Sequence, residues 1–229
     1  MLTEARVEEK VYERYISDTG SEFVTFVELG AAHGFQSTKF SACVERLKSV
    51  TAVKRVFYVL VEAYPPHFPY LDQNWKGRDC KIIYGAVAER SGTARFLTEW
   101  EGCSGKDFWG GAITKLGELE VRTYTLYEIM EIAGIDHISF LHMDIQGSEG
   151  SIVEHCADLS LGGKLENVYV GTHGHPRHEH VREKLSPYMP LKIDAPPKSV
   201  SPTPLGDVQT ADGILFFSHT LDLSRTESA

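Results

Sequence analysis

The chain has 229 residues, of which 42% are hydrophobic and 24% are charged, a composition typical of one folded soluble domain with a single core. Its formal net charge of −9 argues against a dedicated nucleic-acid binder, which normally presents a basic face. No apolar run reaches the roughly 18 residues that cross a bilayer. The charged start MLTEARVEEKVYERY lacks the apolar core of a signal peptide. We therefore expect a cytoplasmic protein with no membrane span.

In chain order, a charged helix over 4–16 and a polar turn over 17–21 precede an apolar run, FVTFVEL, over 23–29. That run is rich in β-branched and aromatic residues, which predicts a buried parallel strand. Further strands are predicted over 55–62, 80–88, 92–100, 138–145, 167–172 and 213–218, and helices over 36–50, 66–75, 126–133, 148–157 and 178–188. Strands that alternate with helices indicate an α/β, doubly wound, mostly parallel sheet with helices on both faces.

The remaining segments are predicted to be irregular. A glycine-rich loop over 102–117 carries Phe108 and Trp109, and is either a hinged lid over a ligand or an ordinary surface loop. A proline-rich loop over 196–207 and a polar, frayed tail over 221–229 complete the chain. We expect residues 1–229 to form one domain, with a leading helix and turn over 1–20.

Ligands of doubly wound sheets bind beyond the carboxyl ends of the strands, so we expect the binding residues to follow the strands. Gly30 and Gly34 follow the first strand, where Gly30 allows a tight turn and Gly34 allows close approach of the backbone to a ligand. Their G-x-x-x-G spacing differs from the G-x-G-x-x-G of dinucleotide enzymes, and no phosphate-binding Lys follows. A turn needed only for helix packing is the alternative.

Glu62 ends the second strand, where a carboxylate can accept hydrogen bonds from both hydroxyls of a ribose. The alternative is a solvated carboxylate at a strand end. Ala86 and Val87 follow in the third strand, where small side chains leave room for a flat base or simply pack the sheet.

The fourth and fifth strands end in residues suited to proton transfer. Asp144 ends the fourth strand, and Glu149 opens the next helix, where the helix dipole favours an anion. His173 ends the fifth strand at the start of a histidine-rich tract and is predicted to face Asp144. A general base and a metal ligand are both open roles for this histidine.

Five stretches together resemble the FkbM-type methyltransferases, which depend on S-adenosylmethionine and mostly methylate oxygen. They are VELGAAHGFQS (27–37), LVEAYPPHFPYLDQNW (60–75), IIYGAVAERSGTARF (82–96), YTLYEIM (124–130) and LHMDIQGSEGSIVE (141–154). The resemblance implies a seven-stranded, Rossmann-like sheet whose last strand is antiparallel. Two positions depart from the family pattern: Tyr127 stands where an Asp is usual, and the fifth strand ends in Gly-Thr-His.

The resemblance also implies which residues bind S-adenosylmethionine. Glu28, Gly30 and Ala31 would line its methionine part, Glu62 would hold the ribose, Ala63 would lie beside the adenine, and Ala86 and Val87 near the base. Gly34, Ser37 and Asp144 complete the predicted cofactor set, and Asp144, Gly147 and Glu149 match the family's Asp-x-x-Gly-x-Glu motif.

The predicted reaction is O-methylation of a small-molecule or sugar hydroxyl. His173 would be the base, Asp144 would orient it or the acceptor, and Glu149 would bind the acceptor or complete an acidic cluster. In a metal-assisted version, the same three residues bind Mg²⁺. Two other functions stay open at this point: an NAD-dependent oxidoreductase on a similar sheet, and a non-catalytic binding or scaffold module.

Overall fold

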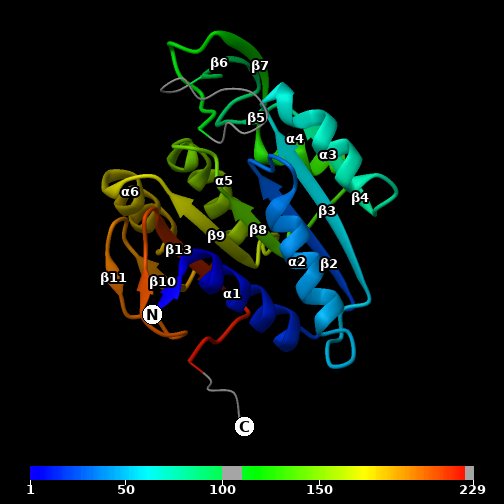
Figure 1. The fold of residues 1–229 in the computed structure, drawn as a ribbon, viewed down its shortest axis with the longest axis vertical. Coiled ribbons are helices and arrows are strands. Elements are labelled where there is room, and N and C mark those ends of the chain that lie inside the picture. Colours follow the sequence, from blue (N-terminus) through cyan, green and yellow to red (C-terminus); the bar gives the residue numbers. More distant parts are fainter. Residues whose placement is uncertain (100–109, 225–229) are drawn as a thin grey trace.

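A seven-stranded sheet forms the centre of the computed structural model, which describes residues 1–99 and 110–224 (Figure 1). Its strand order is β10-β13-β9-β8-β2-β3-β4. The strands are β2 (Phe23–Leu29), β3 (Arg55–Glu62), β4 (Cys80–Tyr84), β8 (Phe140–Met143), β9 (Asn167–Thr172), β10 (Leu191–Ala195) and β13 (Gly213–Ser218). β13 pairs antiparallel with both of its neighbours, β9 and β10, and every other pairing in this sheet is parallel. The predicted doubly wound sheet with an antiparallel last strand is confirmed.

Helices cover both faces of this sheet (Figure 1). On one face lie α1 (Glu4–Asp18), α2 (Phe35–Arg46) and α3 (Phe68–Trp75), which follows a 3₁₀ turn, η1 (Pro65–His67). On the other lie α4 (Leu126–Ala133), α5 (Glu149–Leu161) and α6 (His175–Leu185). Successive side chains of a strand point to opposite faces, so Val24 and Phe26 of β2 join the first core, whereas Val27 and Leu29 join the second.

Two small sheets flank the central one. The first contains β5 (Ala86–Val87), β7 (Leu119–Tyr124) and β6 (Gly92–Phe96), and lies at the top of Figure 1. The second contains β1 (Leu2–Thr3), β12 (Val208–Gln209) and β11 (Val200–Ser201). Strand β11 lies within the proline-rich segment, which is therefore not wholly irregular.

Several element boundaries differ from the prediction. The expected strand over 80–88 is interrupted at Gly85, where φ is +153° and an added Cβ would lie 2.7 Å from the Arg122 carbonyl oxygen. The chain turns there from the central sheet into β5. The strand expected over 92–100 ends at Phe96, and β7 and β10 were not predicted. Helix α6 begins at His175, earlier than expected, with a proline in its first turn.

The predicted frayed tail over 221–229 is wrong for its first residues. Leu221 and Leu223 are only 3% and 4% exposed and pack in the core beside α1. The free energy gained by burying two leucine side chains exceeds the conformational entropy lost when this polar terminus becomes ordered. Phe108 and Trp109 lie outside the described residues, so the lid over 102–117 stays a prediction. Within the described ranges, no helix is long and apolar enough to cross a membrane.

Gly34, the residue before α2, has a packing role, which is the alternative that the sequence left open for this turn. Its φ is +78°, and an added Cβ would lie 2.0 Å from Nε1 of Trp75, a side chain at the end of α3 that is 1% exposed. The close approach predicted for Gly34 is therefore made to a buried indole rather than to a ligand.

We predict that Gly34→Ala destabilises the protein more than Gly77→Ala does. Gly77 has a similar φ of +75° but no atom within 4 Å of an added Cβ, so its substitution carries only the left-handed backbone penalty of about 1–2 kcal/mol. Overpacking against Trp75 should add about 1–3 kcal/mol at Gly34. Urea unfolding of both variants measures the difference, and equal losses would show that the indole contact is unimportant.

Candidate functional site

At the carboxyl edge of the sheet, the loop after β2 contacts the main chain of β3 and of the loop after β8. The Gly30 and Ala31 amides donate to the Val61 carbonyl, at 3.0 and 2.9 Å, and the Asp144 amide donates to the Leu29 carbonyl at 3.1 Å. Gly30 has φ +80°, and an added Cβ would lie 2.0 Å from the Asp144 carbonyl oxygen. Only glycine fits this position, because both its conformation and its contact exclude a side chain.

Glu28 holds the start of α2. Its carboxylate is 1% exposed and accepts hydrogen bonds from the Gln36 and Ser37 amides, at 3.0 and 2.9 Å, and from the Ser37 hydroxyl at 2.5 Å. Gly34 has no side chain to cap this helix, so Glu28 satisfies amides that would otherwise lack partners. Burial raises the pKa of Glu28 to about 7, although the hydrogen bonds from Ser37 oppose this shift.

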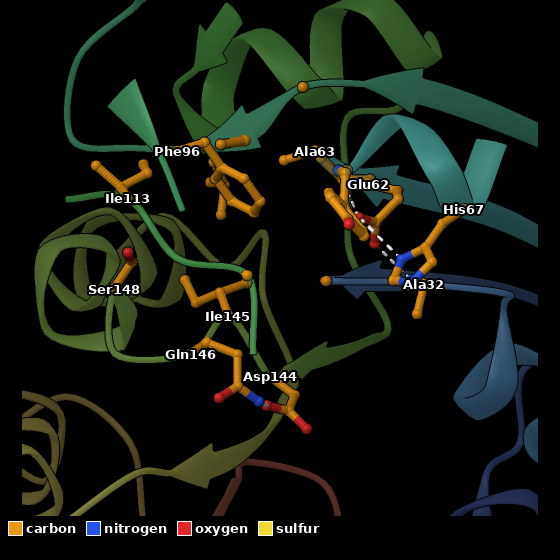
Figure 2. Close-up of a pocket in the computed structure, with 17 residues that line it drawn as sticks. Ala32, Glu62, Ala63, His67, Phe96, Ile113, Asp144, Ile145, Gln146 and Ser148 are labelled. Carbon is orange, nitrogen blue, oxygen red and sulfur yellow. Dashed lines mark hydrogen bonds and ion pairs between the residues drawn. The ribbon is translucent and has the colours of Figure 1, made fainter. Parts of the chain in front are cut away.

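A cavity opens beyond these strand ends, and we call it the first cavity (Figure 2). One part of it is apolar, with walls from Ala63, Ala86, Val87, Phe96 and Ile113. All of these except Ala63 belong to the small β5-β7-β6 sheet or to the bridge beside it. Another part is polar and is lined by residues of the loop after β8, namely Asp144, Gln146 and Ser148. The cavity therefore joins a slot for a flat apolar group to a polar end.

Glu62 lies at the end of β3 with its carboxylate held in place by the backbone (Figure 2). One oxygen accepts from the Tyr64 amide at 2.7 Å and the other accepts from the Ala32 amide at 2.5 Å. His67 Nδ1 lies 3.4 Å from Oε1. Because each carboxylate oxygen has a second lone pair, this oriented group can still accept hydrogen bonds from a ligand in the cavity.

Asp144, Glu149 and His173 meet beside the polar end. His173 Nε2 lies 3.4 Å from Asp144 Oδ1, and His173 Nδ1 lies 3.2 Å from Glu149 Oε1. The Gly147 amide also donates to Glu149 Oε1, at 3.0 Å. Glu149 is fully buried, yet its Oε2 has no hydrogen-bond partner in the described part of the chain. One atom from each of the three side chains lies within 4.8 Å of the other two.

The proton affinities of this cluster are shifted. Burial raises the pKa of Asp144 to about 6, and the Glu149 and Asp212 carboxylates add to that rise while His173 opposes it. Burial acts to lower the pKa of His173, but the Glu149 hydrogen bond and the Asp144 charge outweigh it, so the net shift is upward. For Glu149, burial is outweighed by hydrogen bonds from His173 and the Gly147 amide, so its pKa is lowered. Two titratable groups with raised pKa, Asp144 and His173, therefore lie side by side, an arrangement suited to proton exchange.

The structure brings most of the predicted site residues together. The first cavity is lined by six of them: Gly30, Glu62, Ala63, Ala86, Val87 and Asp144. Four members of the predicted cofactor set do not line it, namely Glu28, Ala31, Gly34 and Ser37, and neither do the predicted catalytic residues Glu149 and His173. Glu28, Ala31, Gly34 and Ser37 position the turn after β2 and the start of α2, through the hydrogen bonds and packing given above.

Several lining residues were missed by sequence reasoning, among them Ala32, Tyr64, His67, Phe96, Ile113 and Gln146. Tyr64 and His67 follow a strand end, which is a usable signal for a ligand-facing position. Phe96 and Ile113 reach the cavity only through pairing within and beside the small sheet, which no local pattern indicates.

The central sheet has seven strands and an antiparallel last strand, β13, as the resemblance implied. Among solved structures, the chain is similar to a putative RNA methyltransferase from Pyrococcus horikoshii, with 13% identity, TM-score 0.49, and coverage of 93% of this chain and 83% of that one. It is also similar to a precorrin-6y C5,15-methyltransferase from Geobacter metallireducens, with 9% identity, TM-score 0.46, and coverage of 92% and 86%.

A third similar structure is fibrillarin from Aeropyrum pernix with natively bound S-adenosyl-L-methionine, at 11% identity and TM-score 0.46, with coverage of 91% of this chain and 74% of that one. No protein-family model and no curated protein sequence matches the chain.

We predict that Glu149→Gln lowers the pKa of His173. The amide can keep the hydrogen bonds to Nδ1 and Gly147, but it removes the negative charge that favours the imidazolium. NMR titration of the imidazole signals measures the shift. His137 is the internal control, because its pKa is also raised, by Glu166, which lies 3.2 Å away. An unchanged His173 titration would show that Glu149 does not set its protonation.

Proposed function

We propose that this protein is an S-adenosylmethionine-dependent methyltransferase of the FkbM type that methylates a hydroxyl oxygen of a small molecule. The observation that carries the proposal is that the first cavity joins an oriented carboxylate and an apolar slot to Asp144, through which it adjoins the cluster of Asp144, Glu149 and His173. We include a cytoplasmic location in the proposal, and an acceptor that is not a nucleic acid, since the formal net charge is −9.

The residues present fit an adenosine-bearing cation. Glu62 would accept hydrogen bonds from the two ribose hydroxyls, and the walls made by Ala63, Ala86 and Val87 would enclose the base. The Asp144 carboxylate at the polar end carries the charge that complements a positive ligand. When bound, S-adenosylmethionine supplies an electrophilic methyl group, so the chain has to orient the acceptor and remove its proton.

His173 is the proposed base. With Nδ1–H donated to Glu149, its Nε2 presents a lone pair toward Asp144 and can take the proton of an acceptor hydroxyl. Asp144 would orient that hydroxyl and stabilise the imidazolium that forms. Because neutral His173 is the active form, turnover should rise as the pH increases through the raised pKa of this residue.

A metal-assisted version of the same reaction has one specific observation in its favour. Asp144, Glu149 and His173 offer three ligand atoms within 4.8 Å of one another, and Glu149 Oε2 is buried without a partner. These residues would bind Mg²⁺, which would lower the pKa of the acceptor hydroxyl. A requirement for Mg²⁺ that chelation abolishes would favour this version over a histidine base.

Calorimetric titration with S-adenosylmethionine and S-adenosylhomocysteine tests the proposal first. We expect micromolar binding, and Glu62→Gln should weaken it about 10- to 100-fold, because charged hydrogen bonds to the ribose are lost. Glu89→Gln, at an exposed carboxylate outside the cavity, should leave the affinity unchanged. If the folded protein binds neither compound, the methyltransferase proposal fails in favour of a scaffold, and binding of NAD instead would indicate an oxidoreductase.

Once an acceptor has been found by screening hydroxylated compounds, His173→Ala should lower turnover by about 10²-fold or more. His175→Ala is the matched control, because His175 is exposed in the next turn and lies outside the cluster. Turnover of His173→Ala equal to that of the parent, at saturating acceptor, would exclude this histidine as the base.

A further inference from the structure

Asp144, Glu149 and His173 form a cluster whose negative charge the chain does not balance with a basic residue. It contains two carboxylates and one imidazole, and no lysine or arginine of residues 1–99 and 110–224 forms an ion pair with either carboxylate. Glu149 is fully buried, and its Oε1 accepts hydrogen bonds from the Gly147 amide and from His173. Its Oε2 is buried without any hydrogen-bond partner among the described residues. A carboxylate oxygen that has lost its hydration needs a donor or a cation in its place, so this atom points to a bound ligand.

The three side chains have a spacing close to that of a metal site. One ligand atom from each lies within 4.8 Å of the other two, and His173 Nε2 lies 3.4 Å from Asp144 Oδ1. Ligand atoms at about 2.0–2.2 Å from a tetrahedral ion lie about 3.3–3.6 Å from one another. Zinc sites with an open fourth position have three protein ligands, and this cluster provides a set of that size.

Neighbouring groups hold two of these ligands in position. The side-chain amide of Gln146 donates to Asp144 Oδ1 at 3.3 Å (Figure 2), and Gln146 has a φ of +52°, a left-handed conformation that few residues other than glycine adopt. Arg177 Nη1 donates to the main-chain carbonyl of His173 at 2.7 Å. Metal ligands are typically oriented by such outer hydrogen-bond partners, so these contacts restrict the ligands before an ion binds.

The ligand types indicate which ion this cluster suits. Mg²⁺ demands octahedral geometry and is usually held by one or two carboxylates and water, whereas an imidazole is a preferred ligand of Zn²⁺, Fe²⁺, Ni²⁺ and Cu²⁺. A neutral imidazole has one nitrogen lone pair, and an ion bound through it takes the lone pair that His173 would need to accept a proton. Such an ion would therefore stop His173 from acting as a base.

We propose that Asp144, Glu149 and His173 bind a divalent transition-metal ion of the Zn²⁺ class, and that this ion inhibits the methyl transfer. The inhibitory role rests on the proposed methyltransferase function, because it acts on the histidine that serves there as the base. The binding site itself does not depend on that function. The inference differs from the magnesium-assisted reaction in both the ion and its effect, since Mg²⁺ would support turnover and Zn²⁺ lowers it.

Calorimetric titration of the chelator-treated full chain with zinc chloride and with magnesium chloride tests the site. We expect one Zn²⁺ ion to bind per chain, at least about 100-fold more tightly than Mg²⁺. Glu149→Gln and His173→Ala should each weaken Zn²⁺ binding about tenfold or more, because loss of an outer partner alone weakens metal sites by about 10- to 100-fold. Co²⁺, a paramagnetic substitute for Zn²⁺, should broaden the imidazole NMR signals of His173 and leave those of His137, which precedes β8, unchanged.

The exposed histidines of α6 provide the matched control for binding at the surface. The double variant His175→Ala/His180→Ala removes two exposed imidazoles that lie outside the cluster and should leave the Zn²⁺ affinity unchanged. Thermal unfolding verifies the fold of each variant. If Glu149→Gln does not fold, Asp144→Asn carries the comparison, because the Asp144 side chain is 41% exposed.

Equal affinity for Zn²⁺ and Mg²⁺ would overturn the choice of ion. Zn²⁺ binding that survives in His173→Ala but not in His175→Ala/His180→Ala would overturn the site. With an acceptor in hand, Zn²⁺ that saturates the site should lower turnover at least about tenfold, and a rise in turnover would overturn the inhibitory role. If S-adenosylhomocysteine binds and Zn²⁺ does not, only this inference fails. If Zn²⁺ binds and S-adenosylhomocysteine does not, the methyltransferase function fails, and with it the role of the ion as an inhibitor.

Discussion

The site depends on the contact between Gly30 and the main chain of Asp144. Without a side chain, Gly30 lets the turn after β2 rest on the turn after β8, where an added Cβ would lie 2.0 Å from a carbonyl oxygen. This contact sets the separation of the two loops and holds Asp144 at the edge of the first cavity.

Carboxylates at neighbouring strand ends have different roles because different amides surround them. Glu28 accepts hydrogen bonds on both oxygens from the first turn of α2 and so holds the start of that helix. Glu62 is oriented by two amides and still faces a cavity. Glu149 orients His173, and Asp144 has a raised pKa suited to proton exchange. Residue type alone predicted acids at the site, and the hydrogen-bond partners determine the role of each.

Sequence reasoning predicted the parts of this protein that depend on local pattern. The apolar runs at β2, β3 and β9 have the bounds expected of them, because buried parallel strands need continuous hydrophobic residues. The placement of Glu62 and Asp144 on one cavity followed from the same reasoning, since parallel strands bring their carboxyl ends to one edge. Edge strand β10 and the paired strand β7 have weaker patterns, because edges and small sheets bury fewer side chains.

The sequence by itself determined the doubly wound fold, and it predicted that Glu62, Asp144, Glu149 and His173 lie at one edge of the sheet. Tertiary structure alone decided that Gly34 packs on Trp75, that Glu28 caps a helix, and that Leu221 and Leu223 join the core. It alone also decided that Glu4 and His142, from segments about 140 residues apart, line one acidic cavity. Contacts between distant segments leave no periodic signal in the chain, because they depend on how whole elements pack rather than on neighbouring residues.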